Sequence, residues 1–193
     1  MSISLDDIRK SFPCPAQREL RDPHLRRAAV LMLFFQDAEK LCVLLTRRTE
    51  DVEHHKGQIS FPGGSRDDGD ESLVATALRE TEEEIGLPHD AVEVLGILDE
   101  YETPSGFAIT PVVGTVPFLP SLKPNSDEVA EILHVPVTLF VNGQNERVDQ
   151  RLVRGVARDV YFYQFGSHEI WGATAAMLRA FLSSVQQDGK KPL

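Results

Sequence analysis

The chain of 193 residues is long enough for one domain with a substantial core, and its 41% hydrophobic and 26% charged residues are typical of a globular protein. Its formal net charge of −10 argues against nucleic-acid binding, which depends on lysine and arginine, and against binding to anionic membranes. No stretch reaches the roughly 18 apolar residues of a membrane span, and residues 1–12 lack the apolar core of a signal peptide, so we expect a cytoplasmic protein.

The first third of the chain predicts a short helix followed by a β-hairpin. Residues 4–12 begin with Ser4, a good N-cap, and carry one apolar face, whereas the prolines at 13, 15 and 23 keep the next stretch irregular. Residues 28–35 and 41–46 are apolar, strand-like runs joined by a short polar segment, and Cys42 is expected to be buried in the second run. Residues 47–58 predict an exposed loop, and residues 59–61 a short strand.

The rest of the chain alternates a helix, several strands and a final helix. Residues 71–85 have helical periodicity, which Gly86 and Pro88 bring to an end. Further strands are predicted at 92–98, 107–118, 129–135, 152–156 and 160–165. A helical turn is predicted at 136–141 and an amphipathic helix at 171–185. This order predicts the α/β class, with a mixed β-sheet sandwiched between helices.

Three glutamates on the predicted helix 71–85 suggest a metal site. Glu80, Glu83 and Glu84 are spaced i, i+3 and i+4, so they share one face, where like charges repel. They also lie in the last turns of the helix, where the helix dipole favours cations. A bound divalent cation would offset both penalties, and carboxylate oxygens suit Mg²⁺ or Mn²⁺. The alternative is an acidic face that is simply solvated.

The pair Gly63–Gly64, followed by Glu71 and by Arg79-Glu80-x-x-Glu83-Glu84-x-Gly86-Leu87, resembles the Nudix box. That box reads glycine, five residues, Glu, seven residues, Arg-Glu, an apolar residue, any residue, Glu-Glu, any residue, Gly and an apolar residue. This chain departs from it twice, because six residues separate Gly64 from Glu71 and because Thr81 stands at the apolar position.

The resemblance extends to the coenzyme A pyrophosphatase-like branch of the Nudix hydrolase superfamily. It is carried by residues 44–48, 55–64, 103–114, 127–132 and 170–175. It implies a Nudix fold over residues 26–187, preceded by a helix and proline-rich lead-in at 1–25 and followed by a tail at 188–193. Glu53 stands where that branch usually has an arginine, which reverses a charge that would favour a polyphosphate substrate.

The resemblance implies metal-dependent hydrolysis of a nucleoside diphosphate derivative, most simply coenzyme A or acyl-coenzyme A, to a phosphopantetheine derivative and adenosine 3′,5′-bisphosphate. Mg²⁺ or Mn²⁺ would be held by Glu80, Glu83 and Glu84, with Glu71 as a weaker ligand. Arg79 would orient one of these carboxylates. The general base stays open between Glu84, Glu102 and Glu128. Substrate contacts are expected from the residues around the glycine pair and upstream of it, namely Arg47, Arg48, His55, Gln58, Gly63 and Gly64.

Two other functions remain open at this stage. One is hydrolysis of ADP-ribose, NADH or dinucleotide polyphosphates by the same chemistry, and the other is a Nudix-fold module that senses a nucleotide without cleaving it. The expected partner is in each case a small nucleotide, with no nucleic acid and no membrane, and the resemblance allows a homodimer.

Overall fold

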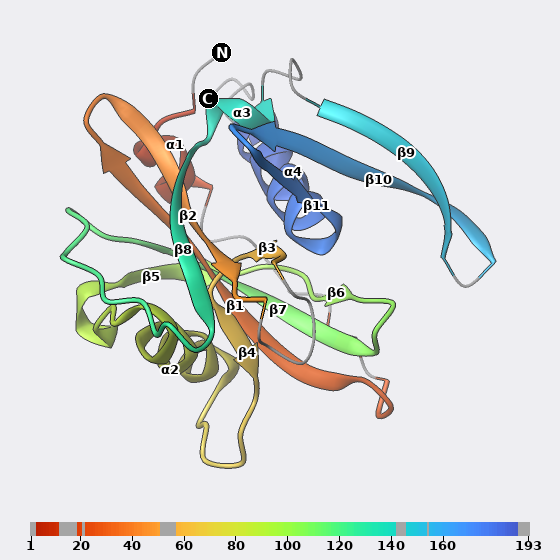
Figure 1. The fold of residues 1–193 in the computed structure, drawn as a ribbon, viewed down its shortest axis with the longest axis horizontal. Helices are drawn as coiled ribbons and strands as arrows, with labels where there is room; N and C mark the ends of the chain where they lie inside the picture. Colours follow the sequence, from red (N-terminus) through yellow and green to blue (C-terminus); the bar gives the residue numbers. More distant parts are fainter. Residues whose placement is uncertain are drawn as a thin grey trace.

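The structure is a computed structural model that describes residues 3–11, 19–20, 22–50, 57–141, 146–153 and 155–188 (Figure 1). The helices are α1 (Leu5–Lys10), α2 (Leu73–Ile85), the 3₁₀ turn η1 (His89–Ala91), α3 (Thr138–Val141) and α4 (Gly172–Asp188). The strands are β1 (Arg26–Asp37), β2 (Lys40–Arg48), β3 (Ile59–Ser60), β4 (Gly63–Ser65), β5 (Glu93–Ile97), β6 (Tyr101–Glu102), β7 (Phe107–Thr115), β8 (Val129–Pro136), β9 (Glu146–Val153), β10 (Val156–Phe165) and β11 (His168–Trp171). Among these residues no helix combines the length and apolar character that crossing a membrane requires.

A mixed sheet forms the centre of the molecule, as the sequence predicts. The predicted hairpin is confirmed, since β1 and β2 pair antiparallel from Phe34↔Val43 to Asp37↔Lys40. On its other side β1 runs parallel to β7, and near its start it also pairs with β4. The path β3-β2-β1-β7-β5 is completed by β8 on β2 and β6 on β7. The start of β1 therefore holds β4 in the sheet and so positions the glycine pair.

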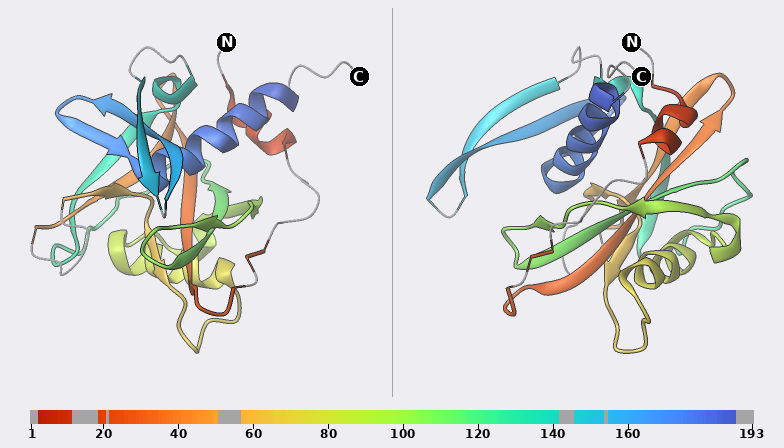
Figure 2. Two further views of the ribbon diagram at one scale, coloured as in Figure 1. Left: turned by 90° about the vertical axis from the view of Figure 1, so that its right-hand side faces the viewer. Right: turned by 180° about the vertical axis from the view of Figure 1, so that it is seen from behind.

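The alternating side chains of β1 divide the core into two layers. Val30, Met32 and Phe34 join the cluster that includes residues of α1 and α4, and Phe34 packs against Phe181 with ring centroids 5.7 Å apart. The residues between them, including Leu31, join the cluster that packs against α2. Helices thus cover both faces of the sheet (Figure 2), and the predicted α/β/α arrangement is confirmed.

Helix α2 is fixed at both ends by local interactions. The Ser72 side chain accepts a hydrogen bond from the backbone N–H of Ala75, so the helix begins at Leu73, two residues later than the periodicity predicts. At the other end Gly86 adopts φ 69° and its N–H donates to the Glu82 carbonyl, which ends the helix as predicted. Thr81 fills the usual apolar position because it is buried and its hydroxyl donates to the Ala77 carbonyl at 2.6 Å.

The late part of the chain differs from the prediction. The expected strands at 152–156 and 160–165 belong to one long antiparallel hairpin, in which β9 already begins at Glu146. Gly155, with φ 78°, lies between β9 and β10, so the predicted segment 152–156 straddles the reversal. The polar sequence of residues 146–151 hid β9, because most of this strand is exposed and shows no apolar alternation. With β11, these strands form a separate sheet of three.

Candidate active site

The glycine pair of β4 lets two glutamates of α2 approach the backbone closely. The Gly63 N–H donates to Glu84 Oε2 at 3.3 Å. Gly63 has φ 144°, and a Cβ atom there would lie 2.3 Å from the Ala29 carbonyl oxygen. A Cβ atom at Gly64 would lie 2.5 Å from Glu80 Oε2, a contact that real structures do not show. Gly63 therefore requires glycine, whereas a side chain at Gly64 would displace the Glu80 carboxylate.

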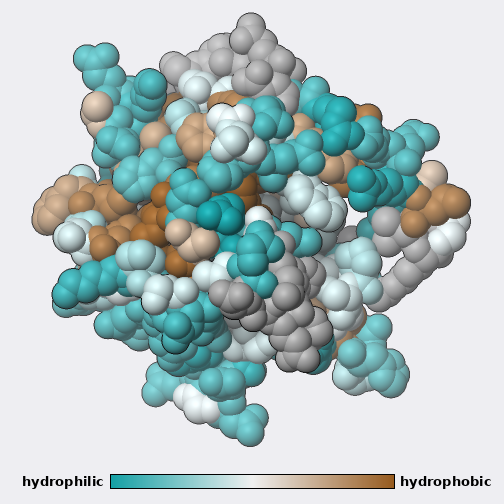
Figure 3. Space-filling model, viewed as in Figure 1, coloured by the Kyte–Doolittle hydropathy of each residue, from teal (hydrophilic) through white to brown (hydrophobic). Residues whose placement is uncertain are grey.

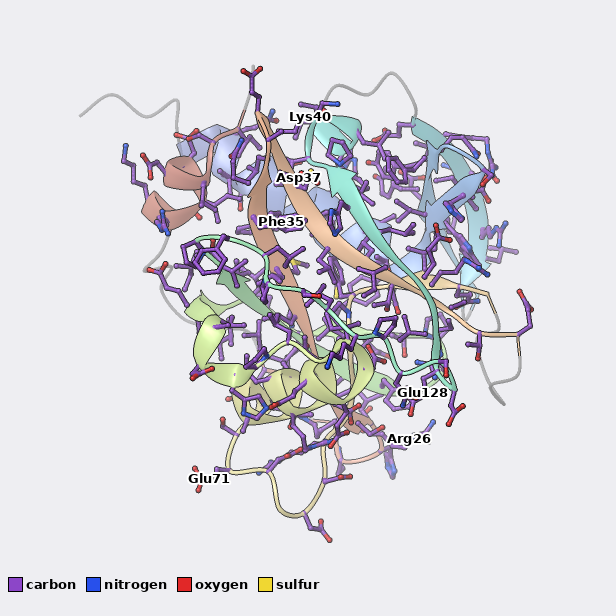
Figure 4. The ribbon with its side chains drawn as sticks, turned by 60° about the vertical axis from the view of Figure 1, so that its left-hand side comes forward. Arg26, Phe35, Asp37, Lys40, Glu71 and Glu128 are labelled. Atoms are coloured by element: carbon purple, nitrogen blue, oxygen red, sulfur yellow. The ribbon has the colours of Figure 1, made fainter. Side chains whose placement is uncertain are left out.

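Glu84 and Glu80 carry poorly compensated charge. The pKa of Glu84 is raised to about 8, chiefly by burial and to a smaller extent by the charges of Glu80 and Glu128, which together outweigh the lowering by the Gly63 N–H and Arg48. Burial also raises the pKa of Glu80. Glu128, at the loop end that leads into β8 and beside α2, contributes to both shifts (Figure 4). A cation placed among these carboxylates would stabilise their ionised forms.

Arg79 has the opposite situation, since carboxylates surround its guanidinium. Its Nε and Nη2 each donate to Asp70 at 3.0 Å. Nη2 also lies 3.0 Å from Glu80 Oε1, and Nη1 donates to Glu83 Oε2 at 3.0 Å. The contact with Nη2 fixes the orientation of Glu80. The prediction that Arg79 orients a carboxylate of the helix is therefore matched by two contacts, to Glu80 and to Glu83.

Asp70, and not Glu71, is the acidic partner of Arg79. Asp70 is 8% exposed and also accepts hydrogen bonds from the Thr76 hydroxyl and from the Asp67 N–H. The hydrogen bonds from Arg79 hold the pKa of Asp70 far below its usual range. Glu71 is exposed, precedes the N-cap of α2 and points away from the helix (Figure 4). The expectation that Glu71 begins the helix is corrected: counted from Gly64, it is Asp70 that follows after five residues, and this spacing could have revealed it.

Glu83 lies at the edge of the arrangement. Its side chain is 59% exposed and is turned towards Arg79. Within the described ranges of the chain, no group of three His, Cys, Asp or Glu side chains forms an arrangement that could hold a metal. Magnesium commonly takes only one or two protein carboxylates and completes its shell with water and substrate phosphates. Glu80 and Glu84, both oxygen donors with raised pKa values, therefore fit such an ion.

The two predicted substrate residues of β2, Arg47 and Arg48, point in opposite directions. Arg48 points towards the glutamates, with Nη1 3.7 Å from Glu84 Oε1, and its Nε is buried without a hydrogen-bond partner among the described residues. Arg47, on the opposite side of the strand, pairs with Glu131 at 3.3 Å. The Gln58 backbone carbonyl accepts a hydrogen bond of 3.0 Å from the backbone N–H of Arg48. His55 and Glu53 lie outside the described residues.

The structure separates two of the predicted general-base candidates. Glu128 lies close enough to Glu80 and Glu84 to affect both pKa values. Glu102 lies on β6, paired with Ala108 of β7. Because β7 in turn pairs with β1, and β1 with β4, two strands stand between Glu102 and the glycine pair.

Comparisons with known proteins show the family of the chain. The NUDIX domain family model matches residues 25–154. The uncharacterized Nudix hydrolase NudL of Photorhabdus laumondii is 40% identical over 187 residues, covering 95% of this chain and 99% of that protein. NudL of Pectobacterium atrosepticum is 36% identical over 183 residues, covering 92% of each chain.

Solved structures share the fold at low sequence identity. The Nudix hydrolase RenU of M. smegmatis superposes with a TM-score of 0.57 at 20% identity, covering 87% of this chain and 88% of that one. A MutT protein of Methanosarcina mazei Go1 gives 0.53 at 18% identity, covering 90% of this chain and 100% of that one. With the domain match and the NudL relatives, they lead to one conclusion: the chain belongs to the Nudix family and is a Nudix hydrolase, an enzyme that acts on pyrophosphate bonds.

Proposed function

We propose that this Nudix hydrolase cleaves the diphosphate linkage of coenzyme A or acyl-coenzyme A, with Mg²⁺ or Mn²⁺ held by Glu80 and Glu84. The observation that carries the metal assignment is the placement of these two desolvated carboxylates against glycine backbone, where their pKa values are raised. The products are a phosphopantetheine derivative and adenosine 3′,5′-bisphosphate.

The residues around the glutamates have distinct proposed tasks. A bound divalent cation neutralises charge on the diphosphate and lowers the pKa of the attacking water. Arg79 keeps Glu80 in place through the 3.0 Å contact. Arg48 offers a phosphate oxygen its Nε–H, which has no hydrogen-bond partner within the described part of the chain. Glu83 is a further proposed ligand, available when its carboxylate leaves Arg79.

Glu128 is the proposed general base. It lies in the turn just before β8 rather than on α2, so it can face a water molecule held between this turn and the helix. Glu84 already receives the Gly63 N–H and is better suited to hold the cation. Glu102 is less well placed, because β7 and β1 separate its strand from β4.

The choice of coenzyme A depends on segments outside the Nudix box, and several of these segments lie together around β3. β2 pairs with β3 through Arg47↔Ile59 and with β8 through Arg47↔Glu131. The Thr174 hydroxyl of α4 donates to the Ile59 carbonyl at 3.2 Å. Residues 44–48, 57–64, 127–132 and 170–175 belong to segments that carry the resemblance to the coenzyme A pyrophosphatase-like proteins, and they contribute to one neighbourhood beside the glutamates.

A panel of substrates tests the proposal. Coenzyme A, acetyl-coenzyme A, ADP-ribose, NADH and diadenosine polyphosphates are incubated with the enzyme and Mg²⁺ or Mn²⁺, and the products are separated by chromatography. The proposal expects coenzyme A compounds to give the highest kcat/KM, with adenosine 3′,5′-bisphosphate as a product. A higher kcat/KM for ADP-ribose, NADH or a dinucleotide would reject coenzyme A and retain the metal site. Absence of any turnover would support the nucleotide-sensing alternative.

A further inference from the structure

The hairpin of β9 and β10 forms an arm that projects beyond α4 (Figures 1 and 2). At the base of this arm, Tyr163 is fully buried, and its hydroxyl donates to Glu146 at 2.5 Å. Farther out the same face loses its cover, since Val148 is 45% exposed and Leu152 is 78% exposed. Apolar residues are visible at the end of the arm in the space-filling view (Figure 3). The arm therefore presents apolar side chains that the chain itself does not bury.

The backbone of β9 is also open. In the sheet β11-β10-β9 this strand lies at the edge, and among the described strands only β10 pairs with it. Exposed sheet edges can pair with a strand of another molecule, and proteins usually protect them with charges. The arginines of β9 lie on the other face, where Arg147 and Arg151 stack over Phe162 at 3.9 and 5.2 Å from the ring centroid. They leave the face of Val148 and Leu152 uncovered.

We infer that β9 pairs antiparallel with β9 of a second copy of this chain, across a twofold axis beside Gln150. This pairing would join the two three-stranded sheets into one continuous sheet. It places Val148 opposite Leu152 of the other copy, and Asp149 opposite Arg151 of the other copy. Each exposed apolar residue then gains an apolar neighbour, and each facing charge gains an opposite one.

The charge pattern of β9 disfavours two of the other possible axes. Along an edge strand, the N–H and C=O groups of every second residue point away from the sheet, and in an antiparallel pair each such residue must face another of the same kind. Two copies of β9 can therefore pair only if one residue faces the same residue of the other copy, and the twofold axis then passes between these two. An axis beside Asp149 would place the two Asp149 side chains together and Arg147 opposite Arg151. An axis beside Arg151 would place two arginines together. Like charges directly opposite one another are unfavourable, so both arrangements are excluded.

An axis beside Val148 gives as many pairs of opposite charge but pairs the apolar residues less completely. It pairs Arg147 with Asp149 and the two Val148 side chains with each other, but it leaves Leu152 opposite residue 144, beyond the start of β9. The most exposed apolar residue of the strand would then gain no strand partner. The axis beside Gln150 is the one that uses both apolar residues and the Asp149–Arg151 complementarity.

Sedimentation velocity of the full chain over about a hundredfold range of concentration tests the association. A reversible dimer is expected, and Leu152→Asp should weaken it at least about tenfold because it introduces a charge opposite Val148. Phe118→Asp is the matched control, since Phe118 is 74% exposed and lies outside the arm. A wild-type chain that stays monomeric, or a dimer that Leu152→Asp leaves unchanged, would overturn the inference.

Exchange of the charges tests the register. Asp149→Arg and Arg151→Asp should each weaken the dimer, because each creates a like-charged pair, and the double variant should restore it. Asp149 also pairs with Arg147 within its own chain, so circular dichroism must show that each variant is folded. Folded variants without rescue in the double variant would contradict the Asp149–Arg151 pairing.

A cysteine at the axis gives a test that does not depend on destabilising the dimer. Antiparallel partners have Cα atoms about 4.5–5.5 Å apart, within the range of a disulfide. Gln150→Cys, in a Cys14→Ser background, should therefore form a disulfide-linked dimer on mild oxidation. Val148→Cys should not, because residue 148 faces residue 152 of the other copy. Cross-linking at 148 and not at 150 would move the axis and reject the proposed register.

Discussion

Asp70, just before α2, and Glu84, in its last turn, are two buried carboxylates, 8% and 4% exposed. Their pKa values are shifted in opposite directions. Asp70 accepts four hydrogen bonds, two of them from Arg79, and its pKa is lowered. Glu84 receives one long N–H contact of 3.3 Å and lies 3.7 Å from Arg48, and its pKa is raised to about 8. Burial alone therefore does not decide the role of a carboxylate: the well-bonded one holds the structure together, and the poorly compensated one is suited to hold a cation.

The largest effect is expected from Glu84→Gln. Loss of a carboxylate that holds the catalytic cation should lower kcat/KM by about a thousandfold. In the absence of metal the same variant should be no less stable than wild type, because it replaces a carboxyl whose charged form is destabilised by burial. Steady-state kinetics and thermal melting in EDTA measure the two effects. Glu82→Gln is the control, since Glu82 is exposed and pairs with His89; equal losses in both variants would refute a specific role for Glu84.

A smaller loss, about a hundredfold in turnover, is expected from Gly64→Ala. The added Cβ would lie 2.5 Å from Glu80 Oε2 and must displace this carboxylate. Gly69→Ala in the following loop is the matched control, because nothing lies within 4 Å of a Cβ atom there. Steady-state kinetics at the same metal concentration measure the turnover of both variants. If Gly64→Ala kept the activity of Gly69→Ala, the contact between Gly64 and Glu80 would have no part in catalysis.

Asp70→Asn should reduce turnover only about tenfold, because it loosens Arg79 and acts on Glu80 indirectly. The melting temperature should fall, since the neutral amide would lack the charge that binds the guanidinium. Differential scanning calorimetry and kinetics check the two expectations. A loss of activity as large as that of Glu84→Gln would place Asp70 among the metal ligands and contradict the contrast drawn above.

The two carboxylates should also give opposite pH dependences of stability in metal-free protein. The raised pKa of Glu84 stabilises the fold below its ordinary value of 4.5, and this contribution is lost as the pH rises towards about 8. The lowered pKa of Asp70 stabilises the fold above its ordinary value of 3.8, and this contribution is lost as the pH falls below it. Urea unfolding from pH 9 down to about pH 2 should show that Glu84→Gln removes the first loss and that Asp70→Asn reduces the second, which begins below pH 3.8. Unchanged profiles in both variants would contradict the assigned shifts.

The sequence predicts the elements whose signals are local. The hairpin of β1 and β2 and the end of α2 follow from apolar runs and from Gly86, and the structure has them where they are expected. β9 could not be recognised, because a projecting strand with charged residues has no buried face to impose alternation.

At the candidate site too, local spacing is predictable from the sequence, whereas contacts between distant segments are not. The glutamates of α2 share a face by helical spacing alone, so Glu80 and Glu84 were predictable as a pair. Their separate surroundings depend on contacts across the fold, including Gly64 against Glu80 and Gly63 against Glu84. The same is true of Asp70, whose contact with Arg79 forms only when the loop between β4 and α2 folds back on the helix.

Titration of metal-free protein with Mn²⁺, followed by electron paramagnetic resonance of the free ion, tests most directly whether Glu80 and Glu84 hold the cation. Wild type and Glu71→Gln should bind Mn²⁺ with the same affinity, because Glu71 is exposed and precedes the helix. Glu84→Gln should bind it at least about tenfold more weakly. Equal Mn²⁺ affinity in wild type and Glu84→Gln would contradict the assignment of this pair as the metal site.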